Sequence, residues 1–140
     1  MKTLKFIALF LATLSLASCN DDDDVTIPST DTSIEGSWKL VNVSGGMLPQ
    51  NFDFAEGEIT WTFNQETGKV VIVNNNTDES KPDYFESGTY NYVFMTTHVL
   101  GNPSLELFIN ETGMGTTVLQ PQVLTLSHAA SDGFTARLIR

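Results

Sequence analysis

Hydrophobic and polar residues alternate with a period of two along most of the chain beyond its N-terminal quarter. In residues 57–64, Ile59, Trp61 and Phe63 fall on one face of the expected strand, and polar residues fall on the other. Such alternation is typical of a β-strand with one buried and one solvated face. No segment has a clear 3.6-residue period, so the pattern predicts an all-β fold, with room for one short helical turn in residues 47–55.

The alternating segments are separated by turns rich in Gly, Asn and Pro, and they predict eight strands. These strands cover residues 36–43, 57–64, 69–73, 86–94, 105–109, 115–119, 122–127 and 134–140. Gly68 is expected to supply the positive φ of the hairpin turn between the second and third. Because an even number of meandering strands lets the first pair with the last and removes the open edges, we predict an eight-stranded antiparallel up-and-down barrel rather than a sandwich.

The N-terminus has a different pattern. Lys2 and Lys5 precede an apolar run over residues 6–16, and small residues then lead to Cys19. A positive start, a short apolar core and small residues before a cleavage site are the marks of a secretory signal peptide. The run has about half of the ~20 residues that a membrane-spanning helix needs. Cys19 is the only cysteine in the chain, which excludes an intramolecular disulfide.

The segment Leu16-Ala17-Ser18-Cys19 resembles the lipobox of bacterial lipoproteins, in which the cysteine is lipidated and becomes the first residue after cleavage. Four aspartates at 21–24 and a Ser/Thr/Pro-rich stretch follow, and this composition predicts a solvated tether. The acidic cluster resembles the export signal of Bacteroidetes-type surface lipoproteins. The resemblance implies an outer-membrane protein anchored by lipid at Cys19 and displayed on the cell surface; a simple spacer at the inner leaflet is the alternative. The expected organisation is a signal peptide (1–18), a lipidated cysteine with a disordered tether (19–33) and a barrel domain (34–140).

A second resemblance lies at the start of the first expected strand. Gly36-Ser37-Trp38 is similar to the Gly-x-Trp signature of lipocalins. In that family the tryptophan closes the narrow end of the barrel, and an arginine from the last strand packs over its ring. If the first and last strands pair, Arg140 comes level with Trp38. The resemblance therefore implies a small lipocalin-like barrel that is closed by Gly36, Trp38 and Arg140.

Charge and side-chain chemistry narrow the functional classes. The chain carries 17 acidic and 7 basic residues, a net charge of −10, so nucleic-acid binding through phosphate contacts is not expected. His98 and His128 lack the spacing of metal ligands, and Ser127 and His128 are sequence neighbours, which does not by itself produce a catalytic pair. No phosphate loop or dinucleotide motif occurs. We expect no catalytic residue, metal or cofactor, and a monomer that is not an enzyme.

The inward-facing aromatic residues leave two functions open. An eight-stranded barrel is just wide enough to be filled by its own side chains or to hold one small ligand. In the first hypothesis, Trp61, Phe63, Tyr90 and Tyr92 line a site for a small apolar molecule. In the second, the same rings form a packed core, and the domain acts through its outer surface on a protein or glycan partner.

Overall fold

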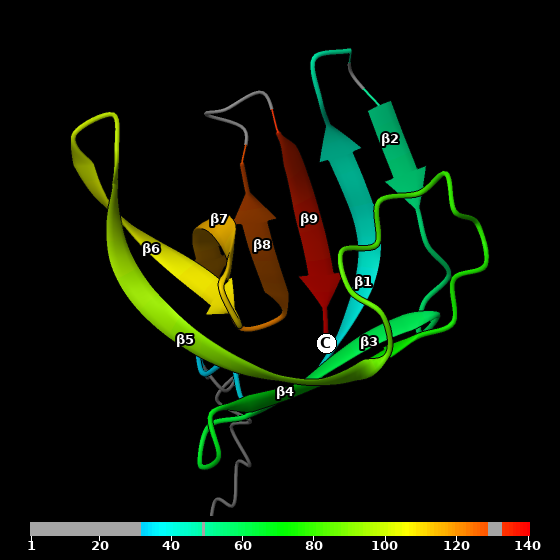
Figure 1. Cartoon of the computed structure of the whole chain (residues 1–140), viewed down its shortest axis with the longest axis horizontal. Coiled ribbons are helices and arrows are strands. Elements are labelled where there is room, and N and C mark those ends of the chain that lie inside the picture. Colours follow the sequence, from blue (N-terminus) through cyan, green and yellow to red (C-terminus); the bar gives the residue numbers. More distant parts are fainter. Residues whose placement is uncertain (1–31, 49, 129–132) are drawn as a thin grey trace, which may run out of the picture.

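The chain folds into a single antiparallel sheet that closes on itself. The computed structural model describes residues 32–48, 50–128 and 133–140, so Cys19 and most of the expected tether lie outside the described residues. The nine strands are β1 (Gly36–Gly45), β2 (Gln50–Asp53), β3 (Ile59–Asn64), β4 (Lys69–Asn74), β5 (Gly88–Val99), β6 (Asn102–Ile109), β7 (Thr112–Leu119), β8 (Val123–Ser127) and β9 (Phe134–Ile139). Each strand pairs with its neighbour in the order β2-β1-β3-β4-β5-β6-β7-β8-β9, and β1 also pairs with β9 (Figure 1).

The short strand β2 corrects the sequence prediction of a helical turn in residues 47–55. Residues 42–45 of β1 pair with β2, while residues 36–40 pair with β3 on the same edge. Gly45 and Gly46 have φ values of +129° and +86°, which glycine adopts without steric cost and which allow the chain to reverse directly into β2. Because β2 and β3 follow one another along β1, they fill one position of the barrel. The predicted closed eight-stranded barrel is thus confirmed.

The interior is apolar and well filled. Trp38, Trp61 and Phe63 have at most 1% of their surface exposed. They belong to one core with residues from every strand except β2 and β5, together with Ile34 and Phe54 that flank the strands. Burying large apolar side chains contributes about 1.5–3 kcal/mol each, so these alternating positions supply the main driving force for closing the sheet.

The segment before β1 and the C-terminal residue Arg140 meet beside Trp38. The indole Nε1 of Trp38 donates a hydrogen bond to the carbonyl oxygen of Ile34, 2.7 Å away. The guanidinium Cζ of Arg140 lies 4.1 Å from the centre of the Trp38 ring, and Arg140 Nη2 donates to the carbonyl oxygen of Ser33. Gly36, which begins β1, has a φ of +99°. The segment before β1 and the last residue therefore cover the tryptophan together.

Strands β5 and β6 extend beyond the barrel wall as a two-stranded ribbon. Pairing between β4 and β5 ends at Lys69 and Asn91, whereas β5 and β6 stay paired as far as Val99 and Asn102 (Figure 1). The sequence pattern placed the end of the fifth strand at residue 94, because the polar residues beyond it do not alternate with apolar ones. A two-residue turn with positive φ at Leu100 and Gly101 closes the ribbon and continues the ladder.

Candidate functional site

The four expected ligand-binding residues lie in two layers of one aromatic cluster. Trp61 and Phe63 on β3 are fully buried, whereas Tyr90 and Tyr92 on β5 are half-buried and pack against the core. The ring centres of Phe63 and Tyr92 are 5.0 Å apart in an edge-to-face arrangement. Phe94 continues the row on β5, with its ring centre 6.3 Å from that of Tyr92. The buried pair thus forms a floor, and the β5 rings form a partly exposed layer on it.

The loop between β4 and β5 covers the other side of this cluster. Phe85 packs on Trp61, with ring centres 5.7 Å apart, and also contacts Tyr90. Two asparagine amides, from Asn74 and Asn76, donate to Asp83 Oδ2 at 2.9 and 3.0 Å and hold the loop in a compact shape. The loop between β4 and β5 is therefore held by its own hydrogen bonds and covers one side of the aromatic cluster through Phe85.

Two polar groups lie within this aromatic cluster, the indole N–H of Trp61 and the hydroxyl of Tyr92. Trp61 Nε1 is buried and finds no hydrogen-bond acceptor among the described residues. A buried donor without a partner is uncommon, because its desolvation is not compensated. Burial raises the pKa of Tyr92, and the negative charge of Glu35 raises it further. The Trp61 N–H and the Tyr92 hydroxyl are therefore polar, uncharged groups in an otherwise apolar environment.

Three pockets in the described part of the chain are lined by residues other than Trp61, Phe63, Tyr90 and Tyr92. Phe85 and Tyr92 occupy the space next to the floor rings. A ligand of this cluster would therefore first contact the partly exposed rings of β5.

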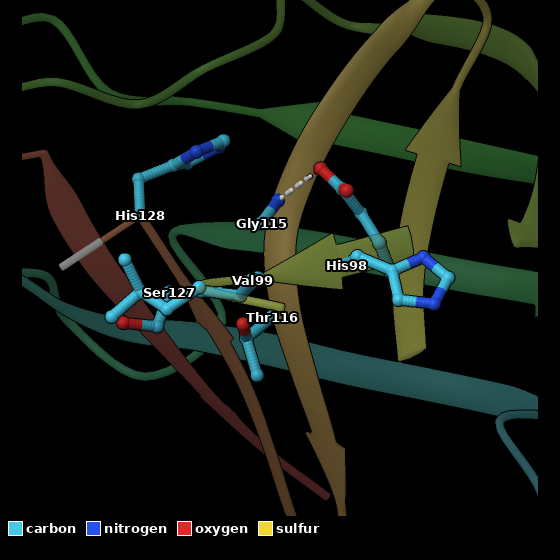
Figure 2. A pocket seen from close by; sticks show the side chains of 8 residues that line it. His98, Val99, Gly115, Thr116, Ser127 and His128 are labelled. Carbon is cyan, nitrogen blue, oxygen red and sulfur yellow. Dashed lines mark hydrogen bonds between the residues drawn. The ribbon is translucent and has the colours of Figure 1, made fainter. Parts of the chain in front are cut away.

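A separate pocket of about 300 Å³ lies where the β5–β6 ribbon approaches the ends of β7 and β8 (Figure 2). It is lined by His98, Val99, Leu100, Glu106, Gly115, Thr116, Ser127 and His128. The two histidines of the chain, which lack the spacing of metal ligands, both line this pocket and lie on opposite sides of Gly115 in Figure 2. The sequence contained no signal for this, because the extension of β5 brings them together and the strand pattern did not predict that extension.

A β-bulge fixes the carboxylate of this pocket. The register of β6 and β7 shifts between Glu106 and Phe108, where β7 carries one extra residue, and the Gly115 N–H in this bulge points toward Glu106 on β6. This N–H donates to Glu106 Oε1 at 3.0 Å, the dashed line in Figure 2. A Cβ on Gly113 would lie 2.5 Å from the same oxygen, so the carboxylate occupies space that only a glycine leaves free. Bulges of this kind frequently re-aim a side chain beside a site.

The other polar groups of the pocket are also held by neighbours. His128 Nε2 lies 3.0 Å from the carbonyl oxygen of Gly113 and therefore donates to it. Ser104 Oγ donates to Thr116 Oγ1 at 3.1 Å, and the hydroxyls of Ser127 and Thr135 are 2.8 Å apart. No group of three or more His, Cys, Asp or Glu side chains in the described ranges has a metal-binding arrangement. The pocket is thus a fixed polar surface built by hydrogen bonds.

The fold defines the class of protein. It is a small antiparallel β-barrel, closed between β1 and β9, with a tryptophan and an arginine at the closure. A family model, the lipocalin-like domain, matches residues 34–126, about two thirds of the chain. The chain belongs to this lipocalin-like family. No curated protein and no solved structure matches it. In the described residues, no helix is long and apolar enough to cross a membrane.

Proposed function

We propose that this chain is a non-enzymatic, lipid-anchored lipocalin-like protein of the outer membrane, displayed on the cell surface, which binds a small apolar ligand on the β5 aromatic row. The ligand proposal rests on the partial solvent exposure of Tyr90, Tyr92 and Phe94. They pack against the core, yet each retains part of its surface exposed to solvent. Large apolar rings that remain partly wet gain free energy when a ligand covers them.

The buried floor adds specificity to this proposal. Trp61 Nε1 lacks an acceptor among the described residues, and the Tyr92 hydroxyl lies in an environment that favours its neutral form. An apolar ligand that carries one hydrogen-bond acceptor, such as a carbonyl oxygen, would satisfy one of these donors. A purely hydrocarbon ligand would leave the Trp61 N–H uncompensated.

The binding test uses detergent-solubilised full-length protein and two adjacent substitutions on β5. Tyr92→Ser removes a ring of the aromatic row, whereas Val93→Ser changes an exposed side chain of the neighbouring position. Mass spectrometry of an organic extract is expected to detect a co-purifying apolar molecule from the wild type and from Val93→Ser, and much less from Tyr92→Ser. Equal recovery from both variants, or none from the wild type, would contradict binding on the row.

The anchoring proposal rests on the lipobox-like segment that ends at Cys19, and a single substitution tests it. Wild-type protein is expected in the membrane fraction after a high-salt wash, and Cys19→Ala is expected in the soluble fraction because it cannot be acylated. Ser18→Ala, which keeps a small residue before the cysteine, serves as the control and should remain membrane-bound. A protease added to intact cells should degrade the wild-type domain if it is displayed on the surface, whereas protection would place it on the periplasmic side.

A second candidate function, an interaction module with a packed core, is favoured by the surface of the β5–β6 ribbon. Val93, Met95, Leu100 and Leu105 are between 45% and 90% exposed on this projecting hairpin. Projecting apolar side chains are typical of contact surfaces for another macromolecule. In this case Met95→Ser would reduce cross-linking to a protein or glycan partner in cells, while the extract of the purified protein would contain no ligand.

A further inference from the structure

The pocket between the β5–β6 ribbon and β7 combines an unneutralised carboxylate with acceptor groups. The second carboxylate oxygen of Glu106 receives no hydrogen bond from any described residue, and the lining contains neither lysine nor arginine. The one ion pair in the described part of the chain joins Lys39 to Glu56 and leaves Glu106 without a cation. A half-buried carboxylate without a counter-charge attracts a cation more strongly than a fully solvated one does.

The remaining lining groups fit the same kind of ligand. Because His128 uses Nε2 to donate to the Gly113 carbonyl, Nδ1 is a hydrogen-bond acceptor whenever the ring is uncharged. Thr116 Oγ1 adds a hydroxyl oxygen on the neighbouring strand. Val99 and Leu100 supply an apolar wall from the ribbon, and Leu100 is 90% exposed. An ammonium group offers three donors, so it can bond several of these acceptors at once.

We infer that this pocket is a binding site for a small organic ammonium ion, with Glu106 as its counter-ion and the ribbon residues Val99 and Leu100 in contact with its alkyl part. The volume of about 300 Å³ lies at the lower end of the range for small-molecule sites and suits a ligand of few heavy atoms. The net charge of −10 raises the local concentration of cations around the whole protein and increases the rate of encounter. This site is distinct from the aromatic row of β5 and does not depend on it.

The position of Glu106 is a built feature rather than a chance surface charge. The β7 bulge presents the Gly115 N–H to one carboxylate oxygen, and Gly113 leaves the space that this oxygen occupies. Together they orient the other oxygen without neutralising the charge. Two substitutions can therefore separate charge from placement: Glu106→Gln keeps an oxygen for the Gly115 N–H and removes the charge, whereas Gly113→Ala keeps the charge and displaces the carboxylate.

The test is a titration of the full-length protein, in non-ionic detergent, with n-butylammonium, n-butanol and butyrate. Calorimetry and the NMR chemical shift of the Gly115 amide monitor binding. We expect saturable binding of n-butylammonium and no saturable binding of n-butanol or butyrate. Glu106→Gln should weaken binding about tenfold or more, since it removes a charge-assisted contact. Gly113→Ala should weaken it to a similar degree.

The matched control is Glu111→Gln, which removes the same charge from an exposed position in the turn after β6. It should bind n-butylammonium like the wild type. Binding of n-butanol as tight as that of the cation, or equal losses in Glu111→Gln and Glu106→Gln, would overturn the inference. If Glu106→Gln does not give a folded amide spectrum, Gly113→Ala decides, and wild-type affinity in that variant contradicts the assigned role of Glu106.

Discussion

Arg140, the last residue of the chain, lies over the ring of Trp38, with its guanidinium carbon 4.1 Å from the ring centre. The contact joins residues that are about 100 positions apart and lies where β1 and β9 pair. Trp38 is completely buried, and its N–H is bonded to the Ile34 carbonyl. The barrel closure therefore combines a strand ladder, a buried ring and a cation–π contact at one place.

Trp38→Ala should lower the free energy of unfolding by about 3–5 kcal/mol, because it removes a large buried ring and leaves a cavity. Arg140→Ala should cost only about 0.5–2 kcal/mol, the range of a cation–π contact. Trp38→Phe, which keeps an aromatic ring but loses the N–H donor, is expected between the two. Urea denaturation followed by circular dichroism measures all three, and a larger loss from Arg140→Ala than from Trp38→Ala would contradict this ranking.

Gly115→Ala should be strongly destabilising, because a Cβ at this position would lie 2.2 Å from the carbonyl oxygen of Ser127 and the φ is +77°. The steric clash and the left-handed backbone together amount to roughly 2–5 kcal/mol. Gly101→Ala is the matched control, since it has a φ of +83° but nothing within 4 Å of its Cβ. Thermal unfolding should show a clearly smaller decrease in Tm for the control, and equal decreases would argue against the bulge geometry.

Thr117→Val should destabilise the barrel by about 1–3 kcal/mol, although valine has nearly the same shape and a high strand propensity. Thr117 is 6% exposed, and its Oγ1 accepts the Leu107 N–H at 2.9 Å, a bond that replaces a missing ladder hydrogen bond at the bulge. Valine would leave that N–H buried without a partner. Thr62→Val, on an exposed position of β3, should change the unfolding free energy by no more than about 0.5 kcal/mol in the same denaturation experiment.

Stability should fall at alkaline pH because of Tyr84. Burial raises the pKa of the Tyr84 hydroxyl to about 12, from a value near 10 in the unfolded chain. Between these pH values the folded state holds a proton that the unfolded state has released, so the unfolding free energy decreases as pH rises. Thermal unfolding at a series of pH values from about 9 to about 12, a range that spans the two pKa values, measures this loss of stability. Tyr84→Phe should show a weaker dependence on pH. An identical dependence in Tyr84→Phe would assign the effect to other groups.

The fold was largely predictable from the sequence, because the strands that form the core alternate clearly. Ile59, Trp61 and Phe63 were expected on one face, and all three are buried. The positive φ expected at Gly68 is confirmed at +63°. The strand β2 was missed because its one half-buried apolar residue, Phe52, gives no alternation, and pairing with β1 decides its conformation instead.

The candidate sites were less predictable than the fold. The aromatic residues could be assigned to the inward face, but a sequence pattern does not show how completely Phe85 and the neighbouring rings fill the space beside Trp61. The Glu106 pocket depends on the register shift in β7 and on the extension of β5 to Val99, both of which arise from tertiary pairing. His98 and His128 line the same pocket only through these two features.

The pairing of β1 with β9 also sets the order in which this protein can be completed. Strand β9 follows the other described strands in the sequence, and until it is available the edges of β1 and β8 that pair with it remain open. Contacts between such distant segments are slow to form, since a long loop must close first. A chain without β9 would expose the unpaired backbone N–H and C=O groups of two strand edges, which are templates for pairing with other chains. A form of this protein that lacks β9 should therefore self-associate more readily than the closed barrel.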